Sequence, residues 1–315
     1  MNVAYLFAGQ GSQYIGMGKD LSEAYPESKA VFEKSDQVLG FSLSRLCFEG
    51  PQEELTRTQN CQPAILTVSI AAFNAFKSAV PAAGGSAFGV SCQLSAVSYV
   101  AGLSLGEYSA LVAAGALSFE DAVYLVRRRG EFMEEAALHS PGKMASILGL
   151  DLAIIKNICK QTGAEVANIN CPGQIVISGA AMNIDEAVKL AQGQGAKRAV
   201  LLEVSGAFHS SLMQEASLKL TRELDKIKIN EPRIPIVSNV SAGPVMSASE
   251  IKENLTKQVF SSVLWEDSMR FIISKGIMGF IEFGPGKVLK GLMRRIDEDA
   301  QVINIEKKED ILSLQ

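Results

Sequence analysis

Residues 97–113 read VSYVAGLSLGEYSALVA and constrain the fold more than any other stretch of the chain. The run SYVA is typical of a short strand, and the residues after Ser104 are good helix formers. Between them, Gly102, Ser104 and Gly106 form a Gly-x-Ser-x-Gly pattern. In a nucleophile elbow a strand turns sharply into a helix with a serine at the apex, and the flanking glycines leave space for that strained backbone. The pattern predicts such an elbow with Ser104 as a nucleophile; a small residue in a tight turn is the alternative interpretation.

Short strand-like runs alternate with helical patterns along most of the remaining chain. We expect strands at VAYLF, IPIVS, GFIEF and QVINI, and helices over residues 20–38, 63–80, 210–228, 249–258, 265–275 and from Lys287. This alternation favours a parallel sheet with helices packed on it.

Residues 143–205 follow a different order of elements: strand, helix, strand, strand, helix, strand, which is the order of a ferredoxin-like unit. We therefore predict an α/β fold in two parts. A large α/β-hydrolase-like domain, residues 1–140 and 206–315, contains a parallel sheet and the nucleophile elbow, and a small ferredoxin-like α+β domain, residues 141–205, is inserted into it. The cleft between them is the expected ligand site. A Gly- and Ala-rich stretch, Pro81–Gln93, is interpreted as a loop insertion ahead of the elbow.

Composition excludes several classes of protein. A chain of 315 residues that is 47% hydrophobic and 20% charged can build a large core, and its net charge of -4 argues against a nucleic-acid binder. Its five cysteines show no Cys-x-x-Cys pair, so we expect a reducing compartment and no structural metal. The N-terminus lacks a basic segment before its apolar run, and no run reaches the roughly 18 apolar residues of a membrane span. We expect a soluble cytoplasmic protein without a membrane contact.

A serine hydroxyl needs a base to take its proton, and histidine is the usual one. The sequence has only two histidines. His139 lies at the predicted end of a long helix, where a capping role fits the helix dipole. His209 lies at the exit from the predicted small domain and becomes the base if Ser104 reacts.

The predicted helix that opens at Ser118 carries an arginine on its apolar side. Arg129 is spaced with the stripe of Ala122, Val126, Met133 and Ala136, so it faces the core. A guanidinium in such a place needs an acceptor. Spacing alone leaves two partners open, an internal acid and the carboxylate of a substrate.

The N-terminal strand runs into the glycine-rich segment AGQGSQYIGMG. Its spacing fits neither of the two glycine patterns of nucleotide-binding loops, and Met17 stands where a phosphate-binding loop has lysine. A nucleotide site is therefore disfavoured. Gln10, at the carboxyl end of this strand, is a candidate for holding an oxyanion near the elbow.

Together these segments resemble the malonyl-CoA:acyl carrier protein transacylases, the acyltransferases that load malonyl groups for fatty acid synthesis. The resemblance covers nearly the whole chain, in the order GQGSQ at 9–13, QPAILT at 62–67, GLSLGEYSAL at 102–111, RG at 129–130, ANINCPGQIVISG at 167–179, GAFHSSLM at 206–213, SNV at 238–240, KQVFSSVLW at 257–265 and GPGKVL at 284–289. The order and spacing make the set specific.

The resemblance implies a role for each matching residue of the reaction centre. Ser104 is the acylated nucleophile and His209 its base, oriented by a backbone carbonyl instead of an aspartate. The backbone amides of Gln10 and Leu105 form the oxyanion hole, and Arg129 binds the free carboxylate of the malonyl group.

Further residues match the family in the pocket and near it. Gln258 matches a glutamine that lines the pocket, and Phe208 is expected to limit space for branched acyl groups. Leu103 stands where the family commonly has histidine, and we expect altered packing there. A basic surface for the carrier is expected on or near one late helix, and its candidates are Lys287, Lys290, Arg294 and Arg295. An ordinary solvated face is the alternative interpretation of these cations.

The expected reaction is a ping-pong transfer from malonyl-CoA to a holo-acyl carrier protein, with no cofactor beyond the coenzyme A of the substrate, in a monomeric enzyme. A polyketide-type acyltransferase and a serine hydrolase are alternatives, and a hydrolase has no need of Arg129. A nucleotide-dependent oxidoreductase lacks its glycine pattern here. A non-catalytic carrier-binding protein would have no need of Ser104 or His209.

Overall fold

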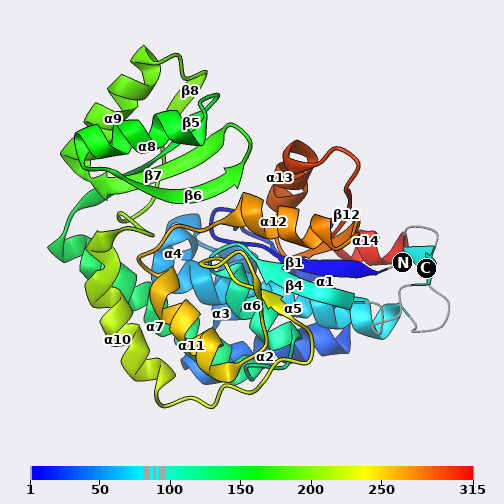
Figure 1. Ribbon diagram of the computed structural model, residues 1–315. Coiled ribbons are helices and arrows are strands. Elements are labelled where there is room, and N and C mark those ends of the chain that lie inside the picture. Colours follow the sequence, from blue (N-terminus) through cyan, green and yellow to red (C-terminus); the bar gives the residue numbers. More distant parts are fainter. Residues whose placement is uncertain (1, 81–85, 88–89, 92–96, 315) are drawn as a thin grey trace.

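The computed structural model describes residues 2–80, 86–87, 90–91 and 97–314. Its larger unit is built on a six-stranded sheet with the order β10-β9-β4-β1-β11-β12. The central strand β1 pairs in parallel with β4 on one side and with β11 on the other (Figure 1). The strands of this sheet are β1 Val3–Phe7, β4 Val97–Gly102, β9 Ile236–Val237, β10 Pro244–Val245, β11 Gly279–Phe283 and β12 Gln301–Ile305.

The α/β fold with an elbow is confirmed, with one difference in the sheet. The edge strand β10, which the sequence analysis did not predict, runs antiparallel to β9. Only residues 238–243 join these two strands. A connection this short allows a hairpin and excludes the crossover that a parallel pair requires.

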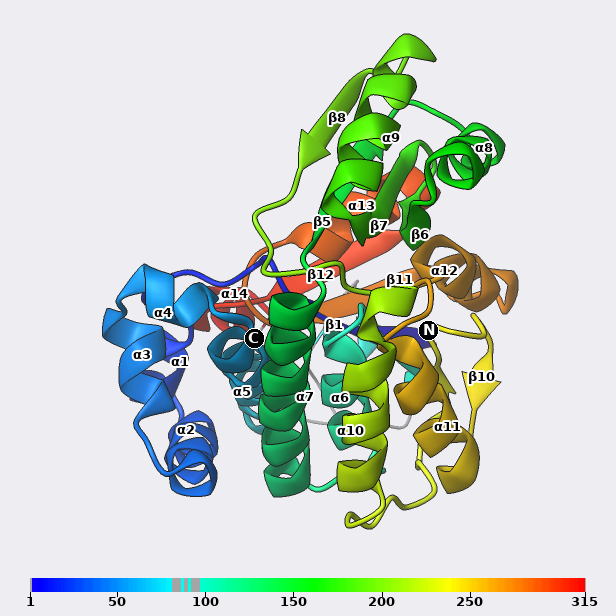
Figure 2. The same ribbon diagram turned by 90° about the vertical axis from the view of Figure 1, so that its left-hand side faces the viewer.

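Helices cover both faces of the large sheet (Figures 1 and 2). Side chains alternate along β1: Val3, Tyr5 and Phe7 belong to the core under α5 and α6, whereas Ala4 and Leu6 belong to the core under α12 and α13. The helices of this unit are α1 Lys19–Ala24, α2 Pro26–Leu39, α3 Leu43–Glu49, α4 Gln52–Thr56, α5 Thr58–Ala79, α6 Gly106–Ala113, α7 Phe119–His139, α10 Gln214–Leu224, α11 Ala248–Gln258, α12 Trp265–Ser274, α13 Val288–Ile296 and α14 Lys308–Leu312.

Three predicted helices differ from the structure in their bounds, and the one expected over 210–228 is limited to α10, Gln214–Leu224. The helix expected over 20–38 is divided into α1 and α2, because Pro26 lacks the N–H that a continuous helix needs and instead begins α2. The helix expected over 63–80 begins at Thr58 and contains Pro63. Most of the predicted insertion at Pro81–Gln93 lies outside the described residues, and its described part pairs two short strands, β2 Ser86–Ala87 and β3 Val90–Ser91.

The smaller unit is a four-stranded antiparallel sheet with the order β6-β7-β5-β8 and two helices. This confirms the ferredoxin-like order. Its elements run from Gly142 to Leu201, and we propose residues 141–205 as the extent of the inserted domain. The elements are β5 Gly142–Leu148, α8 Leu152–Thr162, β6 Glu165–Cys171, β7 Gln174–Ala180, α9 Ala181–Gly193 and β8 Arg198–Leu201.

The two sides of the small sheet have different partners. On β5, Ala145 and Ile147 pack in a core with α8 and α9, whereas Met144 and Ser146 point to the other side, where they line a pocket. The strand β6 fixes the distance to the large unit, because Ile169 N donates to Val263 O at 2.9 Å and Val263 N donates to Ala167 O at 2.8 Å. The small sheet thus forms one wall of the pocket over the large sheet.

Within the part of the chain that the structure describes, none of the helices combines the length and the apolar character that crossing a membrane requires.

Candidate active site

The Gly-x-Ser-x-Gly segment forms the predicted elbow between β4 and α6. Ser104 has a φ of 51°, in the left-handed region that an L-residue adopts only under constraint. A Cβ atom on Gly102 would lie 2.0 Å from the backbone of Gly106, and one on Gly106 would lie 2.2 Å from Phe7 O. Both glycines are therefore required by close backbone approach, and they hold Ser104 at the carboxyl edge of the sheet.

Ser104 and His209 form a hydrogen-bonded pair. Ser104 Oγ lies 2.8 Å from His209 Nε2, and His209 Nδ1 lies 2.8 Å from the backbone carbonyl of Gln258. A carbonyl oxygen can only accept, so Nδ1 carries the hydrogen and Nε2 has a free lone pair for the serine proton. The geometry is that of a nucleophile and its base, with a carbonyl as the orienting group.

The surroundings of His209 keep its ring neutral. The side chain is only 5% exposed, and this burial, together with the positive charge of Arg129, lowers the pKa of His209 from 6.5 to about 4. The carbonyl of Gln258 acts in the opposite direction and does not reverse the shift. At neutral pH the ring is therefore free to accept a proton.

Arg129 is buried at the bottom of the pocket and is 1% exposed. Its Nη2 donates to Ser104 Oγ and to Gln258 Oε1, both at 3.1 Å, and its Nη1 donates to Gln62 Oε1 at 2.8 Å. Among the described residues no carboxylate forms an ion pair with this guanidinium, and its Nε has no partner. A buried cation held by neutral oxygens beside a nucleophile is suited to receive an anionic group.

Comparisons with known proteins agree with this geometry. The model of the family described as "Acyl transferase domain" matches residues 4–303. The chain belongs to this acyltransferase family. It is 48% identical over 314 residues to a malonyl CoA-acyl carrier protein transacylase of Bacillus subtilis, covering 98% of this chain and 95% of the relative.

Solved structures of related acyltransferases have the same fold. An acyl-carrier-protein-S-malonyltransferase of Bartonella henselae is 40% identical with a TM-score of 0.92, over 99% of this chain and 98% of that one. A malonyl-transacylase in complex with the holo acyl-carrier protein of a type II PKS (polyketide synthase) is 36% identical with the same TM-score, over 100% of this chain and 99% of that one.

A layer of polar residues behind the pair was not assigned by the sequence analysis. Asn239 accepts from Ser104 N at 2.6 Å and donates to Gly102 O at 2.8 Å. Glu107 accepts from Gln258 Nε2 at 2.7 Å. The segments SNV and GLSLGE contain two of these residues, Asn239 and Glu107, but neither spacing nor composition indicates what they contact. Gln258 itself was expected to line the pocket and lies one layer behind it, fully buried.

The backbone amides expected to form an oxyanion hole lie on the two segments that meet at the elbow. A Cβ atom on Gly9 would lie 2.5 Å from Leu103 O, which shows how closely the loop after β1 approaches the elbow. No described residue provides an acceptor for the N–H of Gln10 or that of Leu105. Within the described part of the chain, these two amides are therefore unused donors on the segments that meet at the elbow.

The pocket over this centre has a volume of about 400 Å³. Its wall includes Gln10, Leu103 and Phe208 from the large unit, and Asn168 and Asn170 from β6. Phe208 is buried, and Leu103 lies against the loop at Gly9. Space for an acyl chain is therefore bounded by both apolar and amide side chains.

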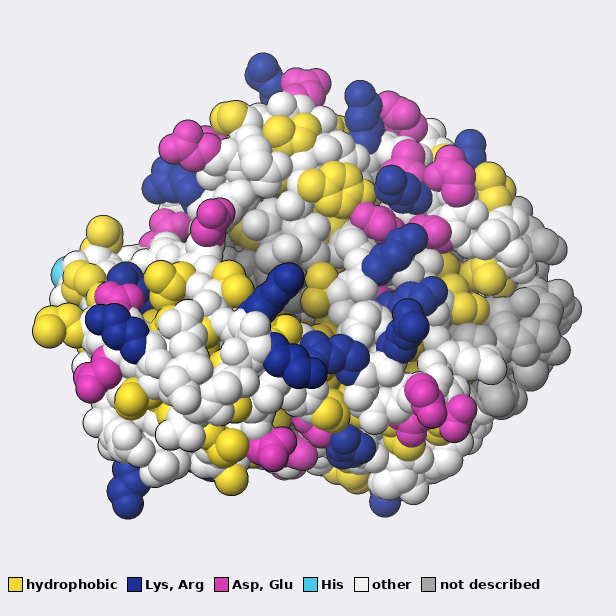
Figure 3. All heavy atoms as spheres, turned by 90° about the horizontal axis from the view of Figure 1, so that it is seen from above, with side chains coloured by type: hydrophobic (Ala, Val, Ile, Leu, Met, Phe, Trp, Pro, Cys, Tyr) yellow, Lys and Arg dark blue, Asp and Glu magenta, His cyan; other side chains and the backbone are white. Residues whose placement is uncertain are grey.

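The four cationic candidates for a carrier surface, Lys287, Lys290, Arg294 and Arg295, lie on or beside α13 and are all exposed. Two apolar residues of the same helix, Val288 and Leu292, line the pocket. Figure 3 shows Lys and Arg side chains gathered around a hollow in the face that Figure 1 has at the top. The helix that carries or adjoins these cations therefore borders the pocket.

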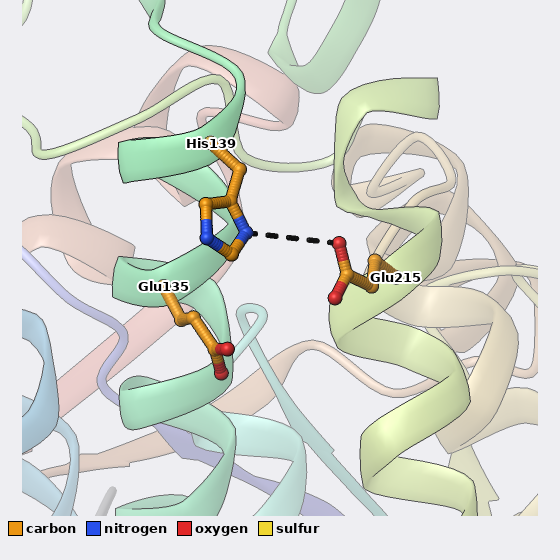
Figure 4. A group of neighbouring side chains, drawn as sticks. All are labelled: Glu135, His139 and Glu215. Carbon is orange, nitrogen blue, oxygen red and sulfur yellow. Dashed lines mark ion pairs between the residues drawn. The ribbon is translucent and has the colours of Figure 1, made fainter.

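The second histidine is remote from the pocket. His139 is in the last turn of α7, exposed, with Nδ1 3.9 Å from Glu215 Oε2 on α10 (Figure 4). Glu135 completes a group that could ligate a metal, but Lys219 Nζ lies 2.8 Å from Glu135 and 2.9 Å from Glu215. An ammonium already pairs with both carboxylates, so we assign no metal to this group.

The lowered pKa of His209 gives a testable pH dependence. Because only the neutral ring accepts the serine proton, labelling of Ser104 by a fluorophosphonate is expected to keep its rate as the pH falls from 8 to about 5, and to halve near pH 4. The rate constant is measured by intact-protein mass spectrometry, and the variant His209→Ala serves as the unlabelled control. Half-maximal labelling near the ordinary histidine pKa of 6.5 would contradict the buried, neutral base.

Proposed function

We propose that this acyltransferase transfers a malonyl group from malonyl-CoA to the phosphopantetheine thiol of an acyl carrier protein, and so supplies fatty acid synthesis. The observation that carries the proposal is the contact of Arg129 Nη2 with Ser104 Oγ at 3.1 Å. A buried positive charge adjoins the nucleophile, so an acyl group attached to Ser104 is favoured when it ends in a carboxylate.

The first half of the reaction acylates the serine. His209 takes the proton of Ser104 as the hydroxyl attacks the thioester carbonyl, and the amides of Gln10 and Leu105 stabilise the oxyanion. The intermediate collapses with loss of the coenzyme A thiolate, which takes the proton from His209. A malonyl-Ser104 ester remains.

The second half returns the enzyme to its starting state. The carrier thiol gives its proton to His209 and attacks the ester carbonyl, and Ser104 leaves as the alkoxide and recovers the proton. The two halves use the same base and the same donors, so the carrier must enter after coenzyme A has left.

Selection of the acyl group rests on charge and on size. The carboxylate of the malonyl group pairs with the planar guanidinium of Arg129, for which lysine is no substitute because a bidentate pair needs the fork of N–H donors. Phe208 narrows the pocket and disfavours a branched acyl group.

The face around α13 is proposed as the docking surface for the carrier. Its four cations attract an acidic partner, and Val288 and Leu292 of the same helix lead into the pocket that the phosphopantetheine arm must enter. A polyketide carrier is a second candidate acceptor, because the related malonyl-transacylase at 36% identity is bound to the carrier of a type II PKS.

We also propose a monomer that works in the cytoplasm. The centre and its pocket are built from residues of one chain. The four described cysteines are free thiols, which suits a reducing compartment.

The variant Arg129→Ala tests the proposed selectivity. Loss of a charge-assisted pair is expected to lower kcat/KM for malonyl-CoA on the order of 100-fold, while transfer from acetyl-CoA is retained or improves. Both values are measured with holo-acyl carrier protein as acceptor. Arg128→Ala is the matched control, because Arg128 pairs with Glu131 on the outer side of α7 and is half-exposed. An unchanged preference for malonyl-CoA in Arg129→Ala would overturn the assignment.

Charge reversal tests the docking surface. The double variant Lys290→Glu, Arg294→Glu is expected to raise KM for the carrier about tenfold, because the electrostatic attraction of the face for an acidic partner is reversed, and to leave the labelling of Ser104 by an uncharged fluorophosphonate unchanged. The matched control reverses Lys156 and Lys160, which are exposed on α8 on the outer side of the small sheet. Equal KM values in the two double variants would place the carrier elsewhere.

A further inference from the structure

A buried carboxylate lies directly behind the reaction centre and has no part in the mechanism above. Glu107 is on α6, in the first turn after Ser104, and is 3% exposed. Its Oε2 accepts from Gln258 Nε2 at 2.7 Å and from Asn239 N at 3.3 Å. One side chain therefore connects the elbow to the segment at Asn239 and to the end of α11.

The hydrogen bonds of the Gln258 side chain run from a group that can only accept to a group that can only donate. At one end the ionised carboxylate of Glu107 can only accept, and at the other end the guanidinium of Arg129 can only donate. The amide of Gln258 lies between them, with Nε2 toward Glu107 and Oε1 toward Arg129 Nη2 at 3.1 Å. Its Nε2 also donates to Ser104 O at 3.0 Å.

Rotation of this amide by half a turn is most unfavourable while Glu107 is an acceptor. The rotated Oε1 would face two acceptors, Glu107 Oε2 and Ser104 O, and the rotated Nε2 would face the donor group of Arg129. An acceptor would then face acceptors, and a donor would face a donor. Because these groups are buried, the loss of their hydrogen bonds is costly.

We propose that Glu107 is a positioning residue that sets the acyl selectivity, because it fixes the amide of Gln258, which in turn fixes the guanidinium of Arg129. Glu107 touches neither the substrate nor the reacting atoms. This inference rests on the proposed function, since it assigns to Arg129 the binding of the acyl carboxylate.

Because Glu107 is titratable, the proposed acyl selectivity depends on pH. Burial raises the pKa of Glu107 to about 7, against the opposing effects of its hydrogen bonds with Gln258 and Asn239 and of the positive charge on Arg129. The other titratable group that interacts with it is Tyr108 on the same helix, whose pKa is raised to about 12. As the pH falls through about 7, Glu107 gains a proton, can also donate, and holds the amide of Gln258 less firmly.

The test uses the isosteric variant Glu107→Gln, whose side chain can accept and donate. The readout is the ratio of kcat/KM for malonyl-CoA to that for acetyl-CoA. This ratio is independent of the concentration of folded enzyme, so partial loss of stability does not obscure it. In the variant the ratio is expected to fall about tenfold through a higher KM for malonyl-CoA, with kcat within about threefold of the wild type.

Three controls separate this role from a general effect on the fold. Glu223→Gln removes a buried carboxylate on α10 that bonds to Tyr124 and Lys226, and it is expected to leave the ratio unchanged. In the background Arg129→Ala, Glu107→Gln is expected to have no additional effect on the ratio. In the wild type the ratio is expected to fall as the pH is lowered from 8 to about 6, whereas in Glu107→Gln it stays constant.

The outcomes distinguish the inference from the function on which it rests. A wild type that transfers no malonyl group would overturn the proposed function itself. A wild type that transfers it, together with an unchanged ratio in Glu107→Gln or an equal effect of that change with and without Arg129, would overturn only the role of Glu107. If Glu107→Gln has no activity, the pH dependence of the wild-type ratio decides: a constant ratio between pH 8 and about 6 overturns the role.

Discussion

The burial of the Arg129 guanidinium is the interaction on which the rest of the centre depends. A positive charge that is 1% exposed must be surrounded by acceptors, and these come from α5, from α11 and from the elbow itself. Burial lowers the pKa of His209 and the same positive charge lowers it further, so the group proposed to bind the acyl carboxylate also helps to keep the base neutral. In the proposed mechanism, substrate selection and activation of the nucleophile are thus coupled through one side chain.

The two units of the fold contribute different parts of the site. The large sheet supplies the strained turn, because a parallel sheet with helices on both faces brings the carboxyl ends of β1 and β4 together. The small sheet supplies a wall of amide and apolar side chains, and the backbone hydrogen bonds between β6 and Val263 set its distance from the elbow. A pocket between the units follows from this arrangement, and only its floor contains the reactive groups.

Local sequence patterns predict the nucleophile and the buried arginine better than they predict the contacts that surround them. The spacing of the glycines around Ser104 indicates a turn in which backbone segments approach each other closely. The apolar stripe on α7 indicates that Arg129 faces the core. Both features can therefore be found from local sequence patterns. Spacing could not decide the partner of Arg129, because the acceptors Gln62 and Gln258 lie 67 and 129 positions away in the chain. The role of Glu107 likewise depends on contacts that form only when α6 and α11 are packed together.

Intact-protein mass spectrometry of the wild type and of Ser104→Ala, mixed with malonyl-CoA and then with a holo-acyl carrier protein, tests the central claim most directly. If Ser104 is the acylated nucleophile of a transacylase, a malonyl-sized adduct forms on the wild type alone and then moves to the carrier. An adduct on Ser104→Ala, or one that is lost to water at the same rate with and without the carrier, would contradict it.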